Sequence, residues 1–159
     1  MSCKERIEGY LDEHGAAYQS HHHPAAAFTA QEIAQAENIP GKLVAKVVMA
    51  FSDKRLVMFV LPAPHWVDLE KAGEELGAAH ARLATEGEFG PFFPDCELGA
   101  MPPFGNLYGI PVYVDRSLAE DRTIFFQGGT HSDIIEMEFA DFVRLADAAI
   151  VDVGHGEAA

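Results

Sequence analysis

The 159-residue sequence has little positive charge and no long apolar run. Its 11 lysines and arginines face 25 aspartates and glutamates, which gives a formal net charge of −14 at pH 7. Because a uniformly acidic surface repels phosphate backbones, we expect no general binding to duplex DNA, and only a local basic patch remains available to a nucleic acid. No apolar run approaches the roughly 20 residues of a membrane-spanning helix, so we expect no membrane association.

Cysteine is also scarce. Cys3 and Cys96 are the only two, and they lie far apart in the sequence with no C-x-x-C pair. This excludes a disulfide framework and a zinc site of four thiolates. The first six residues mix acidic and basic side chains and lack the apolar stretch of a signal peptide. We therefore expect a reducing, cytoplasmic compartment, where disulfides are rare.

Several motifs of nucleotide and metal sites are missing. The sequence contains no G-x-x-x-x-G-K-[ST], no G-x-G-x-x-G after a strand and no H-E-x-x-H. The run His21-His22-His23 is the one histidine cluster, but adjacent residues of an extended segment alternate faces, so three cannot bind one ion. His21 and His23 would need a third ligand to chelate a metal. We expect neither a metal nor another cofactor, and interpret this segment as a strand and loop that line a pocket.

The composition, 48% hydrophobic and 23% charged, is typical of a globular chain. There is no internal repeat and no linker long enough to separate two domains. A chain of this length buries roughly 70% of its unfolded surface, so it needs no metal or disulfide to fold. We expect a single domain over residues 1–159.

Apolar spacing and capping signals predict five helices, and β-branched runs predict six strands. The helices cover residues 5–15, 29–40, 68–76, 80–84 and 139–148. The strands cover residues 44–51, 55–61, 110–115, 123–127, 134–138 and 150–153. The first two strands form a hairpin, residues 86–109 are too rich in glycine and proline for one regular element, and residues 154–159 fray. These elements predict an α+β fold with a mixed central sheet flanked by helices.

Lys46 is the exception in the first strand. Both faces of residues 44–51 are apolar, which predicts an interior strand, and an unpaired buried ammonium is costly. One explanation is that Lys46 lies near the strand end and extends to water. The other is functional: a lysine held in a cleft can bind an anionic or carbonyl oxygen or orient a water.

Residues 42–55 form a basic island on this acidic chain. They hold four of the eleven basic residues and only one acidic residue. Such an island suits one or a few phosphates. The alternative is that these charges protect the ends of a hairpin, as edge-strand charges often do.

Two loops are candidate binding elements. In residues 99–105, adjacent prolines stiffen the chain and glycines let backbone approach a ligand, so backbone N–H groups can face a carbonyl oxygen; the alternative is a rigid turn. Residues 127–131 contain a Gly-Gly pair that predicts a hairpin turn, with His131 as a candidate pocket residue. His131-Ser132-Asp133 cannot form a triad, because consecutive side chains point in different directions.

The order of these features resembles the YbaK-type family, which contains the editing domains associated with prolyl-tRNA synthetase and their free-standing relatives. The resemblance covers roughly residues 15–153 and rests on a series of short motifs. These are His23-Pro24, Thr29-x-x-Glu32, Ala45-Lys46-Val47-Val48, Val67-Asp68-Leu69, the G-x-x-x-P run Gly99–Pro103, Val114-Asp115 and Gly128-Gly129.

The resemblance implies a coiled mixed sheet and metal-free hydrolysis of the ester that joins a wrong amino acid to tRNA. Lys46 is then the catalytic residue, which holds the terminal nucleotide and acyl group, and the 99–105 loop forms the opposite wall of the cleft. The substrate would be the CCA end of a mischarged tRNA, with an aminoacyl-tRNA synthetase as a candidate source of further affinity. The implied substrate-binding residues are His22, Gly99, Ala100, Met101, Pro103, Phe104, Gly105, Gly128, Gly129 and His131.

The chain departs from the family pattern at Pro102, where serine is frequent, and at Gln127, where a small polar residue is frequent. The stretch 128–131 also replaces the His-Pro-x-x-Asn of alanine-specific members, so the amino acid removed is not assigned. Two other functions stay open. The first is a non-catalytic module that binds an amino acid, a nucleotide or a protein in the same pocket, and the second is a hydrolase of small esters or thioesters.

Overall fold

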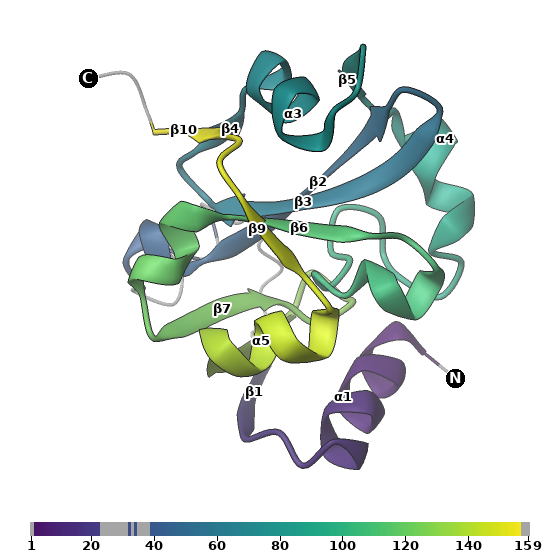
Figure 1. Cartoon of the computed structure of the whole chain (residues 1–159). Coiled ribbons are helices and arrows are strands. Elements are labelled where there is room, and N and C mark those ends of the chain that lie inside the picture. Colours follow the sequence, from purple (N-terminus) through teal and green to yellow (C-terminus); the bar gives the residue numbers. More distant parts are fainter. Residues whose placement is uncertain (1, 23–31, 33, 35–38, 157–159) are drawn as a thin grey trace.

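The computed structural model describes residues 2–22, 32, 34 and 39–156 (Figure 1). Its larger sheet has five strands in the order β5-β2-β3-β6-β9. Strands β3, β6 and β9 run parallel, whereas β2 is antiparallel to β3 and β5, so the sheet is mixed. The strands are β2 (Ala45–Ser52), β3 (Arg55–Pro62), β5 (Ala81–Leu83), β6 (Val112–Asp115) and β9 (Ala149–Val151).

A second, antiparallel sheet has the order β1-β8-β7. It contains β1 (Tyr18–His22), β7 (Thr123–Gln127) and β8 (Asp133–Glu138), while β4 (Trp66–Val67) pairs separately with β10 (Gly154–His155). A parallel bridge between Val44 and Phe125 connects the two larger sheets. The predicted α+β class with a mixed sheet is confirmed, as is the predicted hairpin of β2 and β3.

Side-chain caps fix the helices where the sequence predicts them. Ser2 and Glu5 form a capping box at the start of α1 (Cys3–Glu13). Asp68 accepts hydrogen bonds from the first turn of α3 (Leu69–Leu76), which ends at Gly77 in the left-handed conformation. The short α4 (Glu86–Phe89) lies in the irregular region, and α5 (Phe139–Ala146) closes the fold. Figure 1 shows α3 on one side of the five-stranded sheet and α5 with β7 on the other.

Strand β2 is apolar on both faces, as its sequence predicts. Ala45, Val47 and Met49 belong to the main core, which includes Phe104. Val48 and Ala50 face a smaller core that includes Ala72 of α3. Phe104 is fully buried, and its ring lies 5.5 Å from that of Phe142 and 5.7 Å from that of Phe126. Burying two apolar faces fixes β2 in the interior of the fold.

Two local predictions are wrong. The predicted helix over 80–84 is absent, and residues 81–83 form strand β5. Asp53 accepts hydrogen bonds from the backbone of Ala79 and His80 and so aligns this segment with the edge of β2. Residues 154–155 form β10 and do not fray, because the Asp115 carboxylate accepts hydrogen bonds from the N–H groups of residues 153 and 154.

The predicted helix over 29–40 and the His23-Pro24 pair lie mostly outside the described residues. Within the described part of the chain, no helix is long and apolar enough to cross a membrane.

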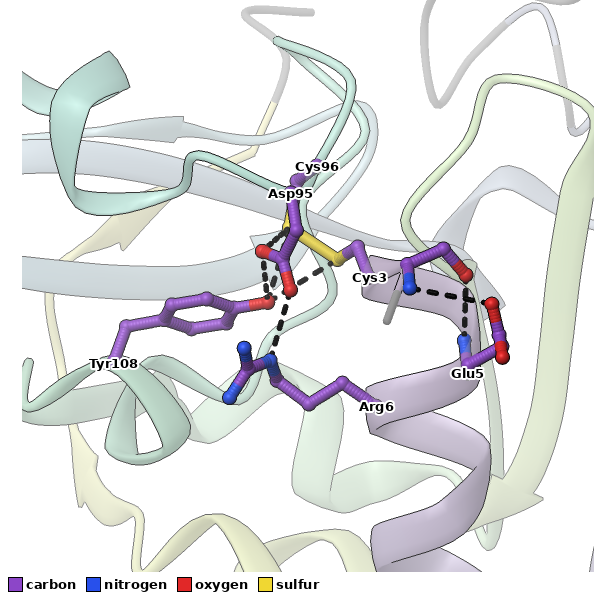
Figure 2. The surroundings of a disulfide bond; sticks show 7 residues. Cys3, Glu5, Arg6, Asp95, Cys96 and Tyr108 are labelled. Atoms are coloured by element: carbon purple, nitrogen blue, oxygen red, sulfur yellow. Dashed lines mark hydrogen bonds and ion pairs between the residues drawn. A yellow bond between two sulfur atoms is a disulfide. The ribbon is translucent and has the colours of Figure 1, made fainter.

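The two cysteines are joined. The sequence analysis excludes a disulfide framework and expects a compartment where disulfides are rare, but the structure contains a Cys3–Cys96 disulfide that links residues 93 positions apart (Figure 2). The N–H of Cys3 also donates to the carbonyl of Asp95, and the Arg6 guanidinium donates to the Asp95 carboxylate at 2.9 Å. The distance between the two cysteines along the sequence did not predict their contact, because the first turn of α1 packs directly against the loop before Gly99.

Asp133, at the start of β8, ties α1 and β1 to the turn that precedes it. Its buried carboxylate lies 3.1 Å from Lys4 Nζ and 2.9 Å from His22 Nδ1, and it accepts a hydrogen bond from Thr130 Oγ1 at 2.5 Å. Burial raises the pKa of Asp133, but the bonds from Thr130, His22 and Lys4 outweigh burial and hold it below its usual value. Ionised Asp133 therefore stabilises the junction of three elements.

We expect reduction of the disulfide to destabilise the fold without abolishing it. A cross-link of this span restricts the unfolded chain and contributes about 2–4 kcal/mol. Denaturant unfolding with and without dithiothreitol measures the difference in midpoint. The double variant Cys3→Ala/Cys96→Ala serves as control and should not respond to dithiothreitol. Equal midpoints for the oxidised and reduced wild type would contradict the prediction.

Asp133 should make stability depend on pH with a defined sign. Because its pKa is lower in the folded protein, ionisation favours folding: the contribution is present above the unfolded value of about 3.9 and is lost as the pH falls through the lower folded value. Asp133→Asn should lower the free energy of unfolding by about 1–3 kcal/mol at neutral pH, and less in acid. Urea titrations of the wild type and of Asp133→Asn at several pH values test this prediction. A difference in unfolding free energy that does not change with pH would refute the role of the charge.

Candidate functional site

Lys46 is half-buried, and among the described residues it has no hydrogen-bond or ion-pair partner. It is the second residue of β2 and alternates with Val44 and Val48, so it lies on the face opposite the main core. Burial lowers its pKa, because desolvation disfavours the ammonium form. In the described part of the chain no carboxylate forms an ion pair with Lys46. A partly desolvated ammonium without a counter-charge is available to an oxygen of a ligand.

The bridge between the sheets puts Lys46 and Gln127 in corresponding positions of two strands. Val44 and Phe125 pair in parallel and pack in one apolar cluster. Two residues further along each strand stand Lys46 and Gln127, on the same face because side chains alternate. The Gln127 side-chain amide nitrogen is buried and has no hydrogen-bond partner. Two donors that have no acceptor among the described residues therefore occupy corresponding positions of the two strands, which is unusual because buried polar groups are normally paired.

A small apolar hollow continues this face along β7 and β8. Its volume is about 140 Å³, and its wall includes Ile39, Phe125 and Ile134. His21 and Glu136, which lie 3.2 Å apart, form its polar rim. Gln127 pairs with Ile134 of this wall, so the hollow lies on the Gln127 face of β7 and β8. An apolar wall with a few polar groups is typical of small-molecule pockets.

The 99–105 loop offers backbone and not side chains. Gly99 is exposed, whereas Ala100, Met101, Pro103 and Phe104 are buried, as are the remaining loop residues Pro102 and Gly105. Gly99 has φ +86°, which favours glycine. Among the described residues, no acceptor pairs with the N–H groups of Gly99 and Met101. These groups can donate to a ligand oxygen.

Two backbone hydrogen bonds attach this loop to the Gly-Gly turn. Glu97 N–H donates to the carbonyl of Gly129, and Gly129 N–H donates to the carbonyl of Ala100, both at 3.0 Å. His131 Nδ1 lies 3.1 Å from a carboxylate oxygen of Glu97. A Cβ atom added at Gly99 would lie 3.4 Å from His131 Nε2, so the ring faces this glycine. The structure therefore joins the predicted loop and turn.

His22 is connected to the loop and the turn through Asp133. The Asp133 carboxylate lies beside His22, and its backbone carbonyl accepts a hydrogen bond from Gly128.

Sequence reasoning missed two residues. It considered Asp133 only as part of a rejected triad, and it did not recognise Gln127 as a donor. The signal for Gln127 was its departure from the small residue frequent in the family.

No hydrogen bond or ion pair among the described residues joins Lys46 to the 99–105 loop. The side chains of Met101 and Phe104 belong to the main core, on the other face of β2. A shared cleft between Lys46 and the loop backbone stays a prediction.

A hollow of about 390 Å³ lies elsewhere, at the carboxyl ends of β3, β6 and β9, and contains none of the predicted site residues. Its polar groups are largely paired within the protein. Asp152 lies 3.2 Å from Lys71 and 3.5 Å from Arg116, and the Asp115 carboxylate accepts backbone hydrogen bonds. Because its charged groups already have partners within the protein, this larger hollow is a weaker candidate for the functional site in spite of its volume.

The comparisons with known proteins concern the fold and the family of the chain. The family model described as an aminoacyl-tRNA editing domain matches residues 23–145. A solved structure titled "a putative trans-editing enzyme for prolyl tRNA synthetase" is similar with a TM-score of 0.85 and 25% identity, over 98% of this chain and 99% of that chain. A hypothetical protein is similar with a TM-score of 0.87 and 20% identity, over 95% of this chain and 100% of that chain.

A comparison with curated proteins gives no significant match. The family match nevertheless spans most of the chain, and it includes Lys46, the 99–105 loop and the Gly-Gly turn. The chain therefore belongs to the aminoacyl-tRNA editing domain family, of the YbaK type.

Proposed function

We propose that the protein hydrolyses the ester bond of a mischarged aminoacyl-tRNA. The observation that carries this proposal is that Lys46 and Gln127, which have no partner for their donors among the described residues, occupy corresponding positions of two strands, and that Gln127 pairs with a wall residue of an apolar hollow. The 3′ end of an aminoacyl-tRNA presents phosphate, ribose hydroxyl and carbonyl oxygens next to an amino-acid side chain. Acceptors of this kind would satisfy both donors, and the apolar surface would take the side chain or the terminal base.

In this proposal the enzyme positions and polarises the ester and forms no covalent intermediate. The free N–H groups of Gly99 and Met101 donate to the carbonyl oxygen and stabilise the negative charge that develops there when water attacks. Lys46 and Gln127 hold the terminal nucleotide and fix the ester relative to these donors. Asp133 and the hydrogen bonds of Gly129 act as positioning groups, because they keep the turn and the loop together.

The charge distribution favours recognition of the tRNA end over broad binding. Lys54 and Arg55 lie at the far end of the β2–β3 hairpin from Lys46, about 20 Å away at the rise of an extended strand. Lys42 pairs with Asp121 at 3.6 Å. The basic island therefore does not form one continuous surface, and on a chain of net charge −14 the proposal assigns part of the tRNA affinity to a partner such as a synthetase.

Lys46→Ala should abolish deacylation while the fold is retained. Loss of one charged donor that stabilises a reacting ester lowers kcat/KM by about 100-fold or more. The measurement is release of amino acid from a panel of mischarged tRNAs, with thermal unfolding as the check on folding. Lys54→Ala is the matched control, because it removes the same charge from an exposed turn.

A Lys46→Ala variant as active as the wild type on every substrate would refute the assigned role. No turnover on any tRNA, together with saturable binding of an amino acid or nucleotide, would favour the non-catalytic module. Faster hydrolysis of free esters than of tRNA esters would favour the small-molecule hydrolase.

Gln127→Leu should change stability and activity in opposite directions. The wild-type amide is buried without an acceptor, and such a group costs about 1–3 kcal/mol. Replacement by leucine removes that cost and should raise the denaturation midpoint, whereas loss of the donor should raise KM for the mischarged tRNA. Unchanged deacylation kinetics would show that Gln127 does not contact the substrate.

A further inference from the structure

We infer that the Cys3–Cys96 pair is a thiol–disulfide exchange site whose redox state controls the geometry of the proposed editing site. The inference rests on the proposed function for its consequence in catalysis, but its structural part stands on contacts of the disulfide alone. Figure 2 shows the disulfide between the start of α1 and the loop that leads to Gly99, with Asp95, Arg6 and Tyr108 around it.

Three segments meet at this disulfide. Cys3 begins α1, Cys96 lies three residues before Gly99, and the Gly-Gly turn packs on Cys3. A Cβ atom added at Gly129 would lie 2.8 Å from Cys3 Sγ and 3.0 Å from the backbone nitrogen of Lys4. Gly129 also exchanges hydrogen bonds with residues 97 and 100. The cross-link therefore fixes the loop and the turn against one rigid helix end.

The Asp95 carboxylate has hydrogen-bond partners other than the two cysteines. The Arg6 guanidinium donates to one oxygen of its carboxylate, and the Tyr108 hydroxyl donates to the other at 2.9 Å. Burial raises the pKa of Asp95, but these two bonds outweigh it and hold the pKa below its usual range. The carboxylate therefore does not depend on the disulfide for its partners.

Polar atoms around the sulfurs also accommodate a reduced pair. Cys96 Sγ lies 3.3 Å from the Tyr108 hydroxyl oxygen and 3.7 Å from Asp95 Oδ1, so a Cys96 thiol has acceptors within reach. Cys3 Sγ lies 3.4 Å from the same hydroxyl. Both states leave the local hydrogen bonds satisfied, which makes the exchange reversible without unfolding of the surroundings.

Unequal exposure of the two sulfurs decides the course of the exchange. Cys3 is 1% exposed, whereas Cys96 is partly exposed. A thiolate of an external dithiol therefore attacks Cys96 Sγ, the Cys3–Cys96 bond breaks, and Cys3 leaves as the thiolate and takes a proton. The second thiol of the reductant then breaks the mixed disulfide. Two electrons and two protons pass to the protein as two thiols form, and the dithiol becomes a disulfide.

A metal site is the competing interpretation of the same residues. Cys3, Asp95 and Cys96 form a group of three ligand atoms within 4.8 Å of one another, among the described residues. The contacts favour redox exchange, because the two sulfurs are bonded to each other and Arg6 already balances the charge of Asp95. Metal binding by the reduced pair is therefore an outcome that the experiment must detect.

The structural arm of the test needs no tRNA. Hydrogen exchange of the Glu97 and Gly129 amides in the intact chain should accelerate at least about tenfold when dithiothreitol reduces the protein, since the hydrogen bonds of both amides lie beside the cross-link. Amides of β3 should exchange at an unchanged rate. Equal rates at residues 97 and 129 in the two states would overturn the inference.

Single variants test which sulfur is attacked. Under native conditions, N-ethylmaleimide should modify the remaining Cys96 of Cys3→Ala at least about tenfold faster than the remaining Cys3 of Cys96→Ala, because only Cys96 is accessible. The reverse order would contradict the exchange step. Protection of the reduced wild type from alkylation by one equivalent of zinc would show a metal site instead.

The functional arm compares deacylation by the oxidised and reduced wild type. Reduction should lower kcat/KM about three- to tenfold, and oxidation should restore it. Cys3→Ala/Cys96→Ala should remain at the reduced value with or without dithiol. An unchanged rate alongside faster exchange at residues 97 and 129 would overturn the control of catalysis. No deacylation in either state would refute the proposed function, and hydrogen exchange would then decide the structural coupling by itself.

Discussion

The parallel bridge between Val44 and Phe125 is the contact on which the candidate site depends. Without it, Lys46 would extend from the edge of one sheet and Gln127 from the end of another, with no relation between them. The bridge puts the two residues in corresponding positions of the two strands, and Gln127 pairs with Ile134 in the wall of the apolar hollow. Local hydrogen bonding between two backbones thereby creates a pair of donors that neither strand specifies alone.

A second constraint lies at the other end of the site, where Gly129 packs on Cys3. Its positive φ and the short distance from an added Cβ to Cys3 Sγ leave room only for glycine. The same residue holds the loop through two hydrogen bonds. Asp133 supports this junction with charge, and the disulfide supports it covalently. The 99–105 loop thus owes its geometry to contacts outside it.

Lys46 and Gln127 each lower the stability of the fold, as polar groups kept for binding a ligand often do. A half-buried lysine and a buried amide without acceptors lower stability, and a fold selected for stability alone would replace them. The main core, with Phe104 at its centre, and the cross-link offset this cost. Unsatisfied donors held rigidly between two sheets are prepared for a ligand that carries oxygen acceptors, as the end of an aminoacyl-tRNA does.

The sequence by itself determined the local elements and the unusual residue. Period-two and capping patterns located the β2–β3 hairpin, α3 with its Asp68 cap, and α1, and the apolar alternation of residues 44–51 singled out Lys46. These features depend on neighbours within a few positions along the chain, which is why pattern alone could predict them.

Tertiary structure decided what lies together. Four features depend on partners dozens of residues away: the strand at residues 81–83, the pairing of residues 154–155, the Cys3–Cys96 disulfide and the bridge between Val44 and Phe125. Their physical causes are an edge strand that needs hydrogen-bond partners, a buried carboxylate that binds backbone N–H groups, and a helix end packed on a loop. No local pattern encodes such contacts, because they exist only once the chain has folded.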